Sequence, residues 1–171
     1  LCLRAEQQGW SYRDFLCSLL SEEVAHRQGT SLNKRIREAH FPFVKTVEEF
    51  NFTYQSQLRL KLLGSFLGPD FVTDGRSLIL LGKPGRGKTH LAVAIALRAI
   101  HNGFSARFVT AAALIEDLSQ QSHSGHLREA LCDYIRPDVL VVDEVGYLTY
   151  GQDAANVLFH LVNERHLRRR A

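Results

Sequence analysis

The sequence predicts an α/β fold: a parallel β-sheet with helices on both faces, preceded by a small all-helical region. Two observations lead to this prediction. Residues 1–75 carry helical patterns only, whereas the chain after Gly75 alternates between short apolar runs and longer amphipathic stretches. Apolar strands that alternate with helices are typical of a parallel sheet that is covered on both faces.

The all-helical region is expected to contain three helices. The first, over residues 11–28, has a Ser-x-x-Asp capping pattern at its start, followed by leucines at helical spacing. The second, over residues 31–39, begins at a serine suited to N-capping. The third follows a Thr-x-x-Glu capping pattern at 46–49 and ends near Gly68.

Beyond Gly75 the sequence predicts alternating strands and helices. Gly103 and Pro137 mark points where a helix should stop before the next strand begins. The expected strands are 77–81, 106–110 and 139–142, and the expected helices are 88–102, 112–121, 127–135 and 153–167.

A glycine-rich segment directly after the first expected strand matches the pattern G-x-x-x-x-G-K-[ST]. In such a turn, backbone N–H groups converge on phosphate oxygens, and a helix that begins at Lys88 directs the positive end of its dipole at the same anion. Lys88 would reach the outer phosphates, and the Thr89 hydroxyl would bind Mg²⁺. The pattern therefore predicts ATP as the ligand. The residues predicted to surround it are Gly82, Lys83, Pro84, Gly85, Arg86, Gly87, Lys88, Thr89 and His90, with packing as the alternative role for His90.

The expected strand 139–142 runs directly into two carboxylates, Asp143 and Glu144. A buried parallel strand delivers acids in this way to the carboxyl edge of a sheet, where ligands bind. Asp143 is expected to support Mg²⁺ opposite Thr89. Glu144 is expected to orient and deprotonate an attacking water, with Lys88 as the second catalytic residue. A nucleotide kinase or small GTPase would not need this glutamate, so the pair favours an ATPase that activates water.

The net charge of the chain indicates no binding surface, but a local cluster of basic residues indicates a possible second one. The formal net charge of +3 equals the arginine run at 168–170, where solvated charges at a helix end are the simplest interpretation. A stripe between residues 24 and 47 is basic and contains a single acid, Glu38. Such a stripe either neutralises phosphates of a nucleic acid or is a solvated helix face. Its basic members are Arg27, Lys34, Arg35, Arg37 and Lys45.

Several classes of protein are not supported by the sequence. The best apolar candidate for a membrane span, 91–100, is interrupted by Arg98 and is shorter than the roughly 20 residues that a crossing needs. No secretory signal is visible. The three cysteines lie far apart without metal-type spacing, and His123 and His126 have no neighbouring ligands. These features predict a cytoplasmic protein with reduced thiols.

With these motifs in place, the chain resembles the IstB-type helper ATPases of bacterial insertion sequences, which are AAA+ proteins related to replicative helicase loaders. The specific part of the likeness is the run Asp-Glu-x-Gly-Tyr-Leu at 143–148, because a phosphate loop alone indicates only a P-loop NTPase. The likeness also includes 110–112 and 154–159. It extends to 41–50, which resembles the link between the family's helical domain and its ATPase core.

The resemblance implies a P-loop NTPase sheet of AAA+ type and a role in transposition. Such a protein would assemble on double-stranded DNA as a homo-oligomer and recruit or stimulate a transposase. It would comprise a helical domain for DNA and partners over residues 1–45, a linker and helix over 46–75, and an ATPase core over 76–171. Within the helical domain, the residues favoured for DNA contact are Lys34, Arg35 and Arg37.

The sequence also departs from the family's pattern. It begins at Leu1, contains no methionine, and ends before the sensor strand and the arginine finger that the family places later in the chain. Without a middle strand, residues 77–81 and 139–142 would face a gap with unpaired backbone groups. We therefore expect a C-terminally truncated, poorly stable chain with weak or no hydrolysis. A helicase loader and a non-hydrolysing nucleotide- or DNA-binding fragment remain as alternative functions.

Overall fold

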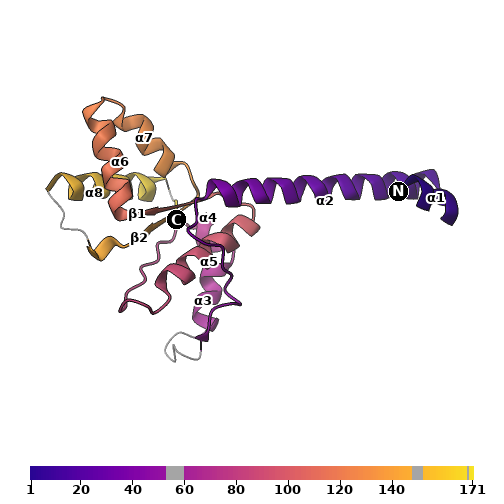
Figure 1. Cartoon of the computed structure of the whole chain (residues 1–171), viewed down its shortest axis with the longest axis horizontal. Helices are drawn as coiled ribbons and strands as arrows, with labels where there is room; N and C mark the ends of the chain where they lie inside the picture. Colours follow the sequence, from indigo (N-terminus) through magenta and orange to yellow (C-terminus); the bar gives the residue numbers. More distant parts are fainter. Residues whose placement is uncertain (53–59, 148–151, 169) are drawn as a thin grey trace. The chain divides into compact units, whose positions relative to one another are not determined.

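The computed structural model describes residues 1–52, 60–147, 152–168 and 170–171 of the chain (Figure 1). These residues divide into two compact units, Leu1–Lys34 and Arg35–Ala171. The elements are α1 (Cys2–Gln8), α2 (Tyr12–Glu38), α3 (Leu60–Leu67), α4 (Asp70–Thr73), α5 (Lys88–His101), β1 (Ala106–Thr110), α6 (Ala111–His123), α7 (Leu127–Ile135), β2 (Val139–Asp143), the 3₁₀ turn η2 (Val145–Tyr147) and α8 (Gln152–Leu167). No helix in these ranges is long and apolar enough to cross a membrane.

The N-terminal region contains one helix that was not predicted, α1, and differs from its prediction at one further point. The capping pattern is confirmed, since the Asp14 amide donates to Ser11 Oγ at 3.2 Å and the Ser11 hydroxyl donates to the Asp14 carboxylate at 2.6 Å. The break expected between residues 28 and 31 is wrong, because α2 is continuous to Glu38. Ser31, the predicted N-cap, lies inside α2, and the hydroxyl of the neighbouring Thr30 donates to the His26 carbonyl at 3.0 Å within the helix.

Strands β1 and β2 form a parallel pair, with Ala106 opposite Val139 and Thr110 opposite Asp143. Because successive side chains of a strand point to opposite faces, Val109 and Val142 share one face, and Asp143 lies on the other. The first face packs against α6, α7 and α8. Helix α5 contacts both strands, and Asp143 reaches its first turn. The described strands are therefore covered by helices on both faces, as predicted (Figure 1).

The prediction of a strand at 77–81 is wrong. These residues form no strand, and the Ile79 and Leu81 side chains are 78% and 90% exposed. A strand requires a hydrogen-bonded neighbour, and in the described part of the chain the only ladder is the one between β1 and β2. The observed sheet is thus an incomplete α/β sheet, and the apolar run that leads into the glycine-rich loop is unpaired.

The other elements of the core follow their predictions closely. Each of the predicted elements 88–102, 106–110, 112–121, 127–135, 139–142 and 153–167 is observed with ends displaced by no more than two residues. Helix α3 ends at Leu67, next to the predicted stop, and residues 53–59, between the predicted capping pattern and α3, lie outside the described residues. The Thr46 amide donates to the Glu49 carboxylate at 2.9 Å, but this pair closes a turn and starts no helix.

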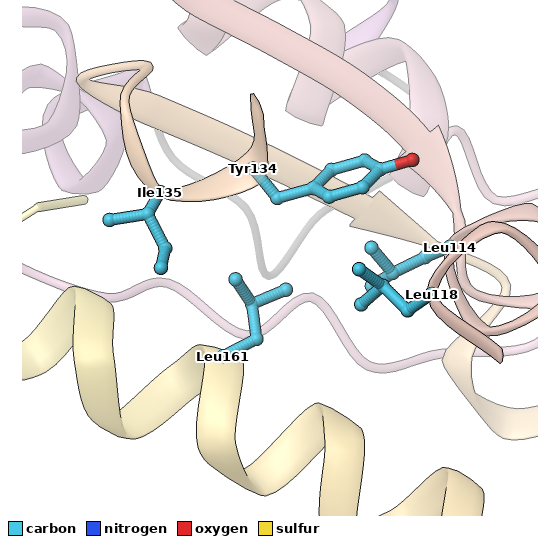
Figure 2. Packing of buried hydrophobic residues seen from close by; sticks show 5 residues of the cluster. All are labelled: Leu114, Leu118, Tyr134, Ile135 and Leu161. Carbon is cyan, nitrogen blue, oxygen red and sulfur yellow. The ribbon is translucent and has the colours of Figure 1, made fainter. Parts of the chain in front are cut away.

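One apolar cluster fixes α6, α7 and α8 against the sheet. Figure 2 shows its five buried side chains converging from these helices: Leu114, Leu118, Tyr134, Ile135 and Leu161. The Tyr134 ring also lies under the Arg107 guanidinium, whose Cζ is 4.6 Å from the ring centroid. The Tyr134 hydroxyl donates to the Asp117 carboxylate at 2.6 Å, so the polar end of this core side chain is satisfied.

A buried arginine ties α8 to the start of β2. Arg165 of α8 donates to the carbonyls of Tyr134, Pro137 and Asp138 at 2.8, 3.0 and 3.1 Å, and also to the carbonyl of Ala171. Burial lowers the pKa of its guanidinium to about 10, which leaves it charged at neutral pH. The guanidinium thus satisfies carbonyls that the end of α7 leaves without helical partners.

The raised pKa of Tyr134 predicts how the stability of the fold changes at alkaline pH. Burial, together with the hydrogen bond and the charge of Asp117, raises the pKa of Tyr134 to about 12. A folded-state pKa above the unfolded value of about 10 favours the neutral phenol, so its contribution is complete below pH 10 and is lost as the pH rises to 12. Arg165 gains stability over the same range because its folded pKa is lowered, so the Tyr134 effect is measured as a difference. In urea titrations between about pH 10 and 12, the wild type should lose about 1–2 kcal/mol more free energy of unfolding than the Tyr134→Phe chain.

Tyr12→Phe is the matched control, since Tyr12 is 96% exposed. This control should follow the wild-type curve. A Tyr134→Phe chain that loses stability as steeply as the wild type would contradict the assignment.

Candidate functional site

The site begins at the turn between residue 81 and α5. Gly87 is the N-cap of α5, with φ of 79°, and its carbonyl accepts the first helical hydrogen bond, from the Leu91 amide at 3.0 Å. This left-handed conformation favours glycine. A Cβ atom on Gly87 would also lie only 2.6 Å from Cε2 of Phe50. Glycine is therefore required here for both its backbone conformation and its lack of a side chain.

The Lys88 ammonium lies inside the curve of the glycine-rich loop. Its Nζ donates to the carbonyls of Gly82 at 2.8 Å and Lys83 at 3.0 Å. The first turn of α5 also has N–H groups without helical partners at this end of the helix. A positive charge and backbone donors thus meet at one place, which is the arrangement that an anion requires.

Thr89 and Asp143 bring the first turn of α5 and the end of β2 into direct contact. The Thr89 hydroxyl donates to Asp143 Oδ2 at 2.6 Å, and this contact is partly buried. Both oxygens are hard ligands of the kind that Mg²⁺ binds. Among the described residues no group of three or more His, Cys, Asp and Glu could hold a metal. A hydroxyl and one carboxylate suit Mg²⁺ as ligands, because this ion keeps several waters and takes further ligands from phosphates.

Glu144 occupies a strained position next to this pair. Its φ is 60°, which is uncommon for a residue other than glycine, and its side chain is exposed. Its amide donates to Asp143 Oδ1 at 2.9 Å. Asp143 thus uses one carboxylate oxygen for Thr89 and the other for the backbone of Glu144. Strained backbone of this kind is frequent at functional sites.

The structure brings together only some of the residues predicted from the pattern. The contact between α5 and β2 is made by Thr89 and Asp143. Lys88 precedes Thr89 in α5, and Glu144 follows Asp143 and bonds to it through its amide. The side chain of His90 turns elsewhere: its Nε2 lies 2.9 Å from the Thr46 carbonyl, and its ring meets that of Phe50. This contact agrees with the alternative packing role, and direct contact of His90 with a nucleotide stays a prediction. The remaining loop side chains, Lys83, Pro84 and Arg86, are exposed.

The basic residues favoured for DNA contact differ in their surroundings. Lys34 and Arg37 are exposed, whereas Arg35 is half-buried and donates through Nη1 to the carbonyl of Gly103. Arg35 therefore helps to attach the end of α2 to the loop after α5. A role for these residues in DNA binding stays a prediction.

Two contacts of the site were not predicted from the sequence. The Phe50 ring against Gly87 and the Thr46 carbonyl against His90 join residues about 40 positions apart in the chain. An aromatic residue in the segment before the core was the only available signal for either contact. A cavity of about 500 Å³ lies elsewhere, against α6 and α7, and includes Asp117, Cys132 and Arg136. None of the residues at the glycine-rich loop lines it.

The close approach of Phe50 to Gly87 can be measured by two alanine substitutions. Gly87→Ala introduces both a strained backbone and a clash, whereas Gly125→Ala, at φ of 80° with nothing within 4 Å of the added carbon, introduces only the strain. We expect Gly125→Ala to lower the free energy of unfolding by about 1 kcal/mol and Gly87→Ala by about 1–3 kcal/mol more. Equal losses in urea denaturation would show that Phe50 does not press on Gly87.

Comparisons with known proteins identify the family to which this arrangement belongs. Residues 1–170 match the family described as IstB-like ATP binding protein. The chain is 35% identical over 163 residues to a predicted ATP-binding protein of insertion sequence IS21 from Pseudomonas aeruginosa, a match that covers 95% of this chain and 62% of that protein. It is 34% identical over 156 residues to the corresponding protein of insertion sequence IS5376 from Geobacillus stearothermophilus, covering 91% and 62% of the two chains.

A third relative, a predicted insertion sequence ATP-binding protein from Sinorhizobium fredii, is 31% identical over 167 residues, covering 97% of this chain and 56% of that protein. The chain thus spans about 60% of the length of these relatives. The resemblance noted in the motifs is confirmed: the chain belongs to the IstB-like family of ATP-binding proteins.

Proposed function

We propose that this chain binds Mg·ATP at the glycine-rich loop and acts as an ATP-dependent helper of DNA transposition. The observation that carries the proposal is the 2.6 Å contact between the Thr89 hydroxyl and the Asp143 carboxylate, beside the Lys88 ammonium. The match to the family over residues 1–170 supports ATP as the ligand. The insertion-sequence names of the relatives favour a role in transposition over the loading of a helicase.

The residues at the loop would share the binding of ATP according to their chemistry. The backbone amides at the start of α5 would donate to phosphate oxygens, and the Lys88 ammonium would move from the Gly82 and Lys83 carbonyls to the outer phosphates. The Thr89 hydroxyl and the Asp143 carboxylate would hold Mg²⁺. The bound ion would neutralise charge on the phosphates.

Glu144 would act as the general base in hydrolysis. Its backbone is fixed next to the metal-binding pair by the bond from its amide to Asp143 Oδ1, while its carboxylate stays exposed. A base must be within hydrogen-bond reach of the attacking water, and the position of Glu144 directly after Asp143, which contacts Thr89, supports this role. In this proposal the strained φ of 60° serves to direct the side chain of Glu144 toward that water.

The partners in this proposal are double-stranded DNA, a transposase of the same mobile element and further copies of the chain. Lys34 and Arg37 would contact DNA phosphates, since both are exposed near the end of α2. The domain roles follow the same scheme, with residues 1–45 for DNA and partners and residues 76–171 for ATP. The AAA+ arrangement of the core is part of the proposal.

Two substitutions separate binding from hydrolysis. Lys88→Ala removes a charge-assisted contact and should raise the Kd for Mg·ATP about 10- to 100-fold in calorimetry. Glu144→Gln should leave this Kd nearly unchanged but slow phosphate release about 10²- to 10⁴-fold, in whichever form of the protein hydrolyses ATP. Arg128→Ala and Glu116→Gln are the matched controls, because they remove charges of the same signs from exposed positions of α7 and α6. A Lys88→Ala chain with wild-type affinity would rule out the assigned site.

DNA binding is tested through its dependence on salt. The double change Lys34→Gln and Arg37→Gln should weaken binding to duplexes of any sequence and reduce the slope of log K against log salt concentration by about 2. Arg35 is left intact because it bonds to Gly103. The control is Arg128→Gln with Arg136→Gln, two exposed arginines of α7 and its C-cap. An unchanged slope in the first variant would contradict the assignment.

A further inference from the structure

The segment 46–50, between α2 and α3 in the chain, forms a fixed turn. The Thr46 amide donates to the Glu49 carboxylate at 2.9 Å, and the Phe50 amide donates to the Val47 carbonyl at 3.1 Å. Val47 is 3% exposed and Phe50 8% exposed, so both side chains are buried. We call this segment the linker turn. Its bonds and buried side chains give it one defined position on the core.

The linker turn contacts the glycine-rich loop at Gly87 and the first turn of α5 at His90. The Phe50 ring lies against Gly87, so closely that an added Cβ would clash with it. The Thr46 carbonyl lies 2.9 Å from Nε2 of His90. Because a carbonyl oxygen only accepts, this Nε2 must carry the proton and donate. The two contacts are joined, since the Phe50 and His90 rings meet edge to face with centroids 5.2 Å apart.

These contacts hold the same helical turn that carries the ligands for phosphate and metal. Thr89 and His90 are consecutive residues of α5, so their side chains leave the helix about 100° apart. Thr89 bonds to Asp143 and His90 bonds to Thr46. The first turn of α5 is therefore held from two directions, by the end of β2 and by the linker turn. Any displacement of this turn changes the position of the amides that would meet the phosphates.

We propose that Phe50 and His90 are positioning residues, which couple the docking of the linker turn to nucleotide affinity. They act through their contacts with Gly87 and Thr46, which hold the first turn of α5 in the geometry that binds an anion. Since coupling between two sites is reciprocal, bound nucleotide stabilises the docked linker turn to the same extent. The nucleotide state is thereby conveyed to the segment that follows α2 in the chain. This inference rests on the proposed function of the loop.

The first test compares nucleotide affinity among variants of the full chain. His90→Leu and Phe50→Leu should each raise the Kd for Mg·ATP about 5- to 10-fold, as expected for the loss of one hydrogen bond or one aromatic contact. His90→Gln should bind within about twofold of the wild type, because its amide N–H can replace Nε2 as the donor. His166→Leu and Phe66→Leu are the matched controls. They change an exposed histidine in the last turn of α8 and an aromatic pair in α3 and α4.

The Kd is measured at a temperature at which each variant is folded, so that a purely structural effect appears only as a lower Tm. An unchanged Kd in both His90→Leu and Phe50→Leu overturns the inference while leaving the proposed function intact. A wild-type chain that does not bind Mg·ATP overturns both.

A second measurement needs no variant. In the wild-type chain, saturating Mg·ATP should slow hydrogen exchange of the Phe50 amide, which bonds to Val47 within the linker turn. We expect protection to rise about 5- to 10-fold, in parallel with the effect on Kd. Mg·ATP that binds without any change in exchange at residues 46–50 overturns the inference, also in the case that His90→Leu or Phe50→Leu fails to fold.

Discussion

The hydrogen bond between Thr89 and Asp143 is the contact on which the rest of the site depends. It exists only because α5 packs on the face of the sheet that carries Asp143, with Val93, Ala96 and Ile100 of α5 buried. That burial sets the height and rotation of α5, and with them the position of Lys88 and Gly87. The second oxygen of the Asp143 carboxylate then fixes the backbone of Glu144. The Asp143 carboxylate thus bonds both to α5, which would bind phosphate, and to the backbone of Glu144, which would activate water.

Much of the core could be predicted because its signals are local. Helices α5 to α8 each carry an apolar periodicity of their own, and Gly103 and Pro137 stop two of the helices before the strands that follow. The run 139–142 is apolar and leads directly into Asp143, so a parallel strand at this position delivers the carboxylate to the carboxyl edge of the sheet. The structure does bring Asp143 and Thr89 together.

The features that were missed depend on partners distant in sequence or on competing local bonds. Residues 77–81 have the composition of a strand, but composition does not supply a neighbour with which to pair. A break in α2 was predicted because Ser31 suits an N-cap, yet Ser31 lies within the continuous helix and the Thr30 hydroxyl bonds to the His26 carbonyl. The contact of Phe50 with Gly87 required knowledge of how the linker turn lies on α5. The positive φ of Glu144 is not encoded by any sequence pattern.

The unpaired state of 77–81 has a consequence for how the phosphate loop is held. In a complete parallel sheet, a strand before the loop would anchor its entrance through backbone hydrogen bonds. In the described chain, the edge of β2 instead bonds to Ala171, through the Leu140 amide, and Ile79 and Leu81 remain exposed. The loop is therefore anchored mainly at its exit, by Thr89 to Asp143 and by His90 and Gly87 to the linker turn. With its entrance unpaired, the loop depends on these exit contacts for its geometry, which is why the linker turn has a direct influence on it.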